Sequence, residues 1–95
     1  MDIKIDDKAV NLIKKQNFED VYIYVEGCSG WGPSEPQPLV LMGQPKQDIE
    51  NFEVHKVDGI NVYVRNDVQA GRDGIQVKYS KFLFKENIIV DGIIY

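Results

Sequence analysis

After residue 20 the chain is a succession of short apolar runs separated by glycine, proline and aspartate, and this spacing constrains the fold more than any other feature. The runs that predict strands cover residues 21–25, 39–42, 52–56, 60–64, 75–79, 82–84, 88–90 and 93–95. Runs this short, at such close spacing, are typical of a small β-sandwich or partial barrel. We therefore expect short and mostly antiparallel strands over most of the chain.

Only one segment of the sequence predicts a helix. Residues 3–5 alternate apolar with charged side chains and predict a first strand. Asp6 or Asp7 is then placed to cap a helix that ends at about Gln16. Its expected apolar stripe consists of Ala9, Leu12, Ile13 and Gln16. The expected fold class is mainly β (α+β), with one N-terminal helix, in a single domain of residues 1–95.

The hairpin around the Asp-Gly pair at residues 58–59 has two available registers. A two-residue turn would pair His55 with Val62 and mix charged side chains into the apolar face. A three-residue loop would instead pair Val54 with Val62 and gather the apolar residues on one face. We expect the three-residue loop, which leaves His55 on the face away from the core, as a surface or interface histidine.

Charge and cysteine content limit the classes of partner and compartment. The formal net charge is −4 and the sequence pI is about 4.8, whereas nucleic acids and anionic membranes are bound through basic patches. We therefore expect neither as a partner. One cysteine cannot form an intrachain disulfide, residues 1–7 lack the apolar segment of a signal peptide, and no apolar run approaches the length of a membrane span. The expected compartment is the cytoplasm.

The only cysteine and the only tryptophan lie together in a glycine-rich stretch that directly follows the run at residues 21–25. Its sequence is Gly27-Cys28-Ser29-Gly30-Trp31-Gly32. Glycines allow the backbone to come close to whatever the thiol meets, and a strand end is a rigid place to display a functional group. Two interpretations remain open: a displayed, functional Cys28, or a tight turn that buries an inert thiol.

Catalytic groups are scarce in this sequence. A cysteine or serine nucleophile needs a histidine base, and His55 is the only histidine. The carboxylates are spread over expected loops and solvent-facing strand positions, which gives no paired acid and base. We therefore expect a protein that is not an enzyme.

Several short motifs follow one another in a specific order. They are Gly27-Cys28-Ser29-Gly30-Trp31, Gln44-Pro45-Lys46, Phe52-Glu53-Val54, Val57-Asp58-Gly59-Ile60, Val62-Tyr63-Val64, Gly74-Ile75-Gln76-Val77-Lys78-Tyr79 and Phe82-Leu83-Phe84-Lys85-Glu86-Asn87. This order resembles the HesB/IscA-like family of A-type iron–sulfur carrier proteins over almost the whole chain. The resemblance implies a HesB-like fold, a role in iron–sulfur cluster assembly, and Cys28 as a ligand of iron or of a cluster.

The chain departs from that family at its C-terminal end. Full A-type carriers have two further cysteines, close together, after the segment that matches residues 84–87, and this chain has none there. It is more similar to a smaller HesB-like branch, some members of which carry a Cys-Cys or selenocysteine motif where this chain has Gly27-Cys28. Iron–sulfur clusters generally take about four protein ligands, mostly thiolates. One chain supplies one thiolate and a homodimer two, so the resemblance implies a labile iron or cluster site, a homodimer, and assembly or client proteins as partners.

Two other functions remain open from the residues themselves. The chain could be a binding module without metal, in which Trp31 and the tyrosines Tyr22, Tyr24 and Tyr63 contact a partner. It could also carry a redox-active thiol that depends on exogenous thiols. The tyrosines have a structural alternative as well, since they could cover the edge of the core with their hydroxyls hydrogen-bonded.

Overall fold

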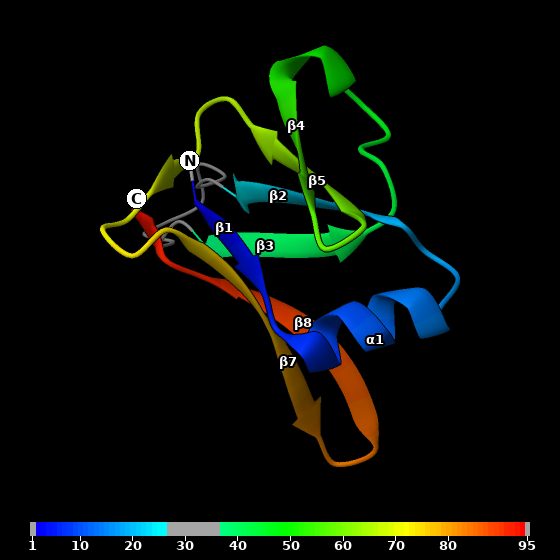
Figure 1. The fold of residues 1–95 in the computed structure, drawn as a ribbon. Coiled ribbons are helices and arrows are strands. Elements are labelled where there is room, and N and C mark those ends of the chain that lie inside the picture. The colour runs from blue at the N-terminus through cyan, green and yellow to red at the C-terminus, as the bar shows by residue number, and fades with distance from the viewer. Residues whose placement is uncertain (1, 27–36, 95) are drawn as a thin grey trace, which may run out of the picture.

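The computed structural model describes residues 2–26 and 37–94, and all structural statements below concern these residues. The order of elements, shown in Figure 1, begins with a strand and the single α-helix and continues with strands. The elements are β1 (Ile3–Ile5), α1 (Asp7–Lys15), β2 (Asp20–Glu26), β3 (Gln37–Met42), a 3-10 helix (Ile49–Asn51), β4 (Phe52–Val57), β5 (Ile60–Arg65), β6 (Gln69–Ala70), β7 (Ile75–Phe82), β8 (Lys85–Asp91) and β9 (Ile93–Ile94). The expected class, mainly β with one N-terminal helix, is confirmed.

The strands form two main sheets and one short pair. The four-stranded sheet has the order β3-β2-β5-β4, the three-stranded sheet has the order β1-β7-β8, and β6 pairs with β9. The β1–β7 and β2–β5 pairs are parallel and the other four pairs are antiparallel, so the strands are mostly antiparallel as expected. Within the described residues the sheets stay open and do not close into a barrel.

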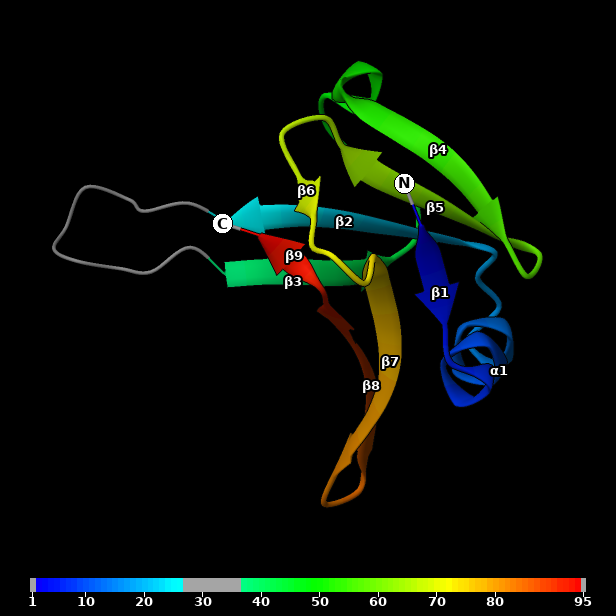
Figure 2. The same cartoon turned by 60° about the vertical axis from the view of Figure 1, so that its left-hand side comes forward.

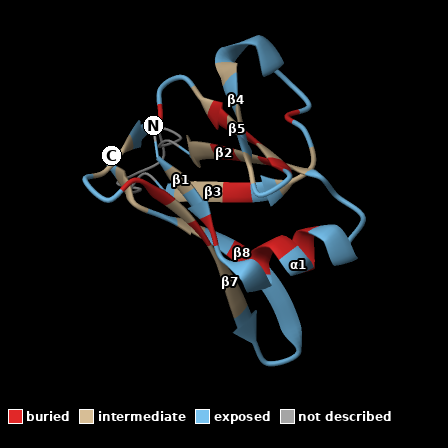
Figure 3. Ribbon diagram, in the orientation of Figure 1, coloured by how far each residue is buried: buried red, intermediate tan, exposed pale blue. Residues whose placement is uncertain are grey.

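The core lies where α1 and the inner faces of the two sheets meet. Period-2 alternation supplies Val21, Ile23, Val62 and Val64 from the four-stranded sheet, all fully or almost fully buried. The helix adds Ala9, Val10, Leu12 and Ile13, while Gln16 is exposed and does not extend the stripe as expected. Figure 3 shows this buried side of α1 facing the strands. No helix in the described ranges is long and apolar enough to cross a membrane.

The β4–β5 hairpin takes the register that we did not expect. Val57 pairs with Ile60 across a two-residue turn at Asp58 and Gly59, and His55 pairs with Val62. Both turn residues are left-handed, with φ of 51° and 81°, as in the type I′ turn whose twist suits a hairpin. The expected three-residue loop is therefore wrong. The Asp58-Gly59 pair forms a favourable two-residue turn, although this register places charged and apolar side chains on the same face.

Residues 82–84 do not form the separate strand that their sequence predicts, because Phe82 ends β7 and the next two residues form a turn. Strands β7 and β8 pair as far as Phe82 opposite Lys85, which leaves Leu83 and Phe84 as a two-residue turn. Figure 2 shows that the far end of this hairpin projects away from the remainder of the molecule. Three apolar residues in succession therefore lie at a hairpin end, where sequence patterns normally place glycine, asparagine or aspartate.

Candidate functional site

The stretch that the sequence singles out lies outside the described residues. This applies to Gly27, Cys28, Ser29, Gly30, Trp31 and Gly32. The structure does describe both sides of it, because β2 ends at Glu26 and β3 begins at Gln37. These two residues are direct cross-strand partners. Cys28 is therefore two residues past the end of β2 in the sequence, and β2 is paired with β3 up to that end.

The three tyrosines of the expected interface lie on one face of the four-stranded sheet, which we call the outer face. Tyr22 is the register partner of Leu41 on one side and of Tyr63 on the other, and Tyr63 is in turn the partner of Val54. The rings of Tyr22 and Tyr24 stack with centroids 5.9 Å apart. All three tyrosines are half-buried and point away from the core, so they do not cover its edge.

Arg65 extends this outer face to the end of β2. Its Cζ atom lies 5.4 Å from the centroid of the Tyr24 ring, in a cation–π arrangement. Its Nη2 atom donates a 2.6 Å hydrogen bond to the carbonyl oxygen of Val25, and its Nε atom donates one of 2.6 Å to Oδ1 of Asp67. The guanidinium is thus fixed beside Val25 near the end of β2, and Val25 lies three residues before Cys28 in the sequence.

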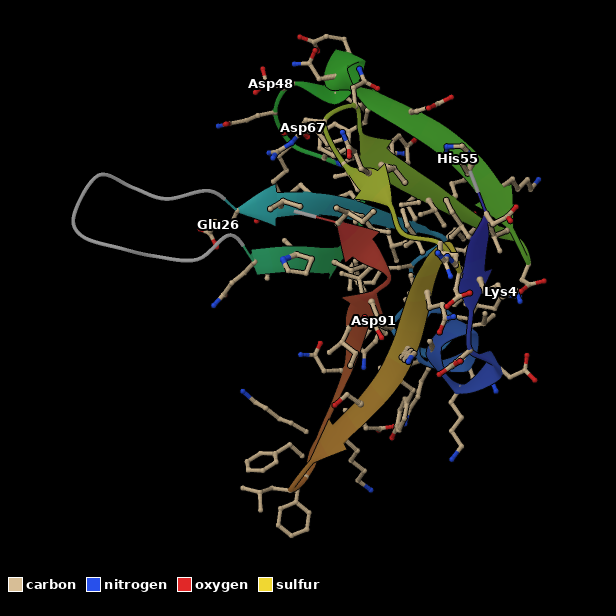
Figure 4. All side chains as sticks on the ribbon, turned by 90° about the vertical axis from the view of Figure 1, so that its left-hand side faces the viewer. Lys4, Glu26, Asp48, His55, Asp67 and Asp91 are labelled. Atoms are coloured by element: carbon tan, nitrogen blue, oxygen red, sulfur yellow. The ribbon has the colours of Figure 1, made fainter. Side chains whose placement is uncertain are left out.

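A shallow hollow opens beside Arg65, and we call it the Arg65 hollow. It has a volume of about 320 Å³ and is lined by Tyr22, Tyr24, Pro45, Lys46, Gln47, Asp48, Phe52 and Arg65. Phe52 forms one wall and meets the Tyr22 ring edge-on, with centroids 6.3 Å apart. Figure 4 shows Glu26 at the end of β2, Asp48 just before the 3-10 helix and Asp67 in the turn that follows β5.

The charges around the hollow are partly paired. The hydrogen bond from Arg65 lowers the pKa of the Asp67 carboxyl below its ordinary value, and the positive charge of Arg65 acts in the same direction. Aromatic walls with a positioned guanidinium are suited to bind a planar or anionic group, because arginine both stacks on rings and donates paired hydrogen bonds. Arg65 and Phe52 were not expected as site residues, although Arg65 continues the alternation of Asn61 and Tyr63 on the same face.

His55 lies elsewhere, and its expected position was wrong. In the observed register it shares a face with Val62 and Glu53, on the side of β4 that contacts β1. Its Nε2 atom is buried without a hydrogen-bond partner among the described residues and lies 3.7 Å from Oε2 of Glu53. Because Val62 is also the partner of Val21, His55 belongs to the end of β2 opposite Glu26 (Figure 4).

The described residues do not assemble a metal centre by themselves. Across residues 2–26 and 37–94, no group of three or more histidine, aspartate or glutamate side chains is close enough to hold an ion. What the described residues do provide is the aromatic outer face and the Arg65 hollow next to the β2 end.

Comparison with known proteins gives one finding. A family model described as the CC/Se motif containing family matches residues 1–93. No curated protein and no solved structure matches the chain. The family's name refers to a CC/Se motif, and this chain has a single cysteine preceded by glycine, so it contains no pair of adjacent cysteines.

Proposed function

The chain belongs to the CC/Se motif containing family, and from that premise we propose that Cys28 is its functional group, binding iron or a labile iron–sulfur cluster. The protein would act as a non-enzymatic accessory or carrier in iron–sulfur assembly, in line with its resemblance to HesB/IscA-like proteins. The family is named for a motif of the residue types that bind soft metals through sulfur or selenium, and Cys28 is the only such thiol in the chain.

One observation carries the proposal on the structural side. The 2.6 Å hydrogen bond from Arg65 to the carbonyl of Val25 fixes a cation at the strand end that leads into Cys28. Metal ligation requires the thiolate, and nearby arginine charge lowers the pKa of a cysteine thiol. The pairing of Glu26 with Gln37 also brings together the two ends of the strands between which Cys28 lies in the sequence.

Ligand number sets the expected strength of binding. A cluster generally takes about four protein ligands, so a single chain leaves three positions to small thiols, a partner protein or a second copy. A homodimer that pools two Cys28 residues would leave two of the four positions, instead of three, to outside ligands. Such a site exchanges its cargo readily, which suits transfer to an assembly or client protein and does not suit storage.

The test is an anaerobic reconstitution with ferrous iron, sulfide and a small thiol, followed by the visible absorption spectrum and by iron per chain. We expect sulfur-to-iron charge-transfer absorption in the wild type and its loss in Cys28→Ser. Ser29→Ala is the matched control, because it changes the neighbouring residue without removing the thiol. A wild type that stays colourless with bound iron near zero would contradict the proposal.

The outer face favours a second candidate function, partner binding without metal. Tyr22, Tyr63 and exposed Val54 and Leu41 form one continuous row across all four strands, and aromatic residues of this kind are enriched at protein interfaces. In this reading the Arg65 hollow accepts a side chain of the partner. Cys28 then acts as a redox-active thiol or has no chemical role.

Paired variants separate the two candidates. Tyr22→Ser combined with Tyr63→Ser should weaken capture of a partner and leave the reconstituted absorption unchanged, whereas Cys28→Ser should do the opposite. The redox alternative predicts a third pattern, a colourless protein in which iodoacetamide modifies Cys28 at neutral pH faster than it modifies free cysteine. Arg65→Gln should slow that alkylation if the guanidinium lowers the pKa of the thiol.

A further inference from the structure

The far end of the β7–β8 hairpin carries an apolar tip formed by Phe82, Leu83 and Phe84. Their side chains are 76%, 76% and 97% exposed, whereas the other exposed large apolar side chains of the described residues do not exceed 58%. Figure 3 colours this end of the hairpin as exposed, and Figure 2 shows it extending beyond the body of the molecule. The apolar tip is therefore both water-exposed and convex.

The turn itself does not require these residues. Leu83 adopts a left-handed conformation, with φ of 57°, at a position that glycine, asparagine or aspartate occupies without strain. Phe82 and Lys85 close the hairpin through backbone pairing that any residue could supply. Because neither the turn nor the core needs Phe82, Leu83 or Phe84, their exposure indicates contact with something outside the chain.

The charges around the apolar tip differ in sign from those of the whole chain. Lys81 and Lys85 flank it directly, and both are exposed. The nearest carboxylate on the hairpin, that of Glu86, accepts a 2.8 Å hydrogen bond from the hydroxyl of Tyr79 and lies 3.6 Å from Nζ of Lys15. The hydrogen bond from Tyr79, together with the charges of Lys15 and Lys81, lowers the pKa of Glu86.

Helix α1 brings further charge to this end of the molecule. Nζ of Lys8 lies 5.9 Å from the centroid of the Tyr79 ring, on the side where Lys15 meets the hairpin. The second carboxylate in reach, that of Asp6, accepts a 3.4 Å hydrogen bond from the backbone N–H of Tyr79. With Asp7 in the first turn of α1 counted as well, four lysines (Lys8, Lys15, Lys81 and Lys85) meet three carboxylates at this end, although the chain as a whole has a net charge of −4.

We propose that the apolar tip inserts into the interface of an anionic lipid bilayer, with Lys81 and Lys85 against the headgroups. Apolar side chains at the depth of the headgroups, together with lysines attracted to anionic lipid, are the two contributions that anchor peripheral proteins. The overall acidity of the chain predicted no such partner. The structure separates the charges, so that the end carrying the apolar tip is the basic one.

A bilayer suits the apolar tip better than a second copy of the chain does. A stable protein interface draws on about 20 to 30 residues from each side, whereas the apolar tip offers three on a narrow hairpin end. A lipid surface requires no complementary shape and accepts a small convex insertion. The outer face lies on the other sheet and stays free for the contacts described above.

The test is co-sedimentation of the full chain with vesicles of phosphatidylcholine alone and with vesicles of equal parts phosphatidylcholine and phosphatidylglycerol. We expect binding to the anionic vesicles at low salt, weakened by high salt because the lysine attraction is screened. Phe82→Ser combined with Phe84→Ser should lower the binding constant roughly tenfold or more. Lys81→Gln combined with Lys85→Gln should lower it by about 25-fold, fivefold for each lysine.

Leu41→Ser combined with Val54→Ser is the matched control, because it removes two exposed apolar side chains from the outer face and should leave vesicle binding unchanged. Urea unfolding of each variant verifies that the fold is intact. The proposal is overturned if the wild type does not sediment with anionic vesicles at low salt, or if the tip variant binds them as the wild type does. Concentration-dependent self-association that the tip variant abolishes, in a protein that ignores vesicles, would identify a second copy as the occupant and would also overturn it.

Discussion

At the scale of single residues, Gly92 has the least room for a side chain among the glycines that the structure describes. It has φ of 83°, and a Cβ atom placed there would lie 2.0 Å from the carbonyl oxygen of Gly74. Gly92 is the single residue between β8, which ends at Asp91, and β9, which begins at Ile93. At this glycine the chain leaves β8 and enters β9, which pairs with β6.

Gly92→Ala should therefore lower the free energy of unfolding by about 2 to 3 kcal/mol, because backbone strain and a clash with a carbonyl act together. Gly59→Ala is the control, since Gly59 has a similar φ of 81° but its Cβ would meet only Nζ of Lys14, at 3.8 Å. Gly59→Ala should lower the free energy of unfolding by about 1 kcal/mol. If urea denaturation gave the two variants equal losses of unfolding free energy, the predicted clash between a Cβ atom at Gly92 and the carbonyl oxygen of Gly74 would be contradicted.

The contact between Asp67 and Arg65 predicts a pH dependence. The pKa of Asp67 in the folded protein lies below its ordinary value of 3.8. The contact therefore contributes fully to the free energy of unfolding above that value, and this contribution is lost as the pH falls through the folded pKa. Because the Asp67 side chain is 63% exposed, the contribution at neutral pH should be only about 0.5 kcal/mol. The difference in unfolding free energy between wild type and Asp67→Asn should thus shrink toward zero in strong acid. Asp73→Asn, which removes a carboxylate outside this contact, should not reproduce that pattern.

At the scale of elements, the β4–β5 register can be tested through two valines. Val54 is 51% exposed on the outer face, whereas Val62 is fully buried on the inner face. Val62→Thr should lower the free energy of unfolding by about 1 to 3 kcal/mol, because it places a hydroxyl in the core. Val54→Thr should change it by no more than about 0.5 kcal/mol. The register that pairs the two valines on one face would instead make both substitutions costly.

The elements that the sequence predicts are those in which local signals agree. Helix α1 has an acidic start, an apolar stripe and lysines in its last turn, and strand β2 alternates without interruption. The β4–β5 register was missed because His55 and Glu53 accept positions on the inner face that their polarity argues against. The β7–β8 turn was missed because nothing in the composition of residues 82–84 marks a turn.

The candidate site was predictable only in part, for a similar reason. The alternation of β2 and β5 fixes the side on which Tyr22, Tyr24 and Tyr63 lie, so their common face follows from the sequence. The neighbourhood of Arg65 does not follow, because β2 and β5 are distant in the sequence and the parallel pairing that joins them has no local signal. The expected three-residue loop would also put Phe52 on the inner face together with Val54, whereas the observed register places both on the outer face.

At the scale of the whole molecule, one apolar cluster joins α1 to both main sheets. Ile23 on the four-stranded sheet and Ile75 on the three-stranded sheet are both fully buried within it. Ile23→Ala and Ile75→Ala should each lower the free energy of unfolding by about 2 to 5 kcal/mol. Each variant should unfold in one transition at a lower urea concentration than the wild type, because the sheets cannot separate without opening the shared core.

The measurement is urea unfolding followed both by far-ultraviolet circular dichroism and by the intrinsic fluorescence of the aromatic side chains. The two signals should coincide for wild type and for both variants. Ile94→Ala, at a side chain 58% exposed, serves as the control and should have little effect. Two separate transitions would mean that the sheets unfold independently.

The parallel pairing of β1 with β7 has a consequence for synthesis on the ribosome. Ile3 finds its partner only at Ile75, so the first strand and the apolar side of α1 are translated long before β7 exists. At usual elongation rates that interval is on the order of ten seconds. During it the nascent chain exposes the side chains that will later form the core. We therefore expect its apolar side chains to stay exposed on the nascent chain for longer than those of a helical domain of the same length, whose contacts are mostly local.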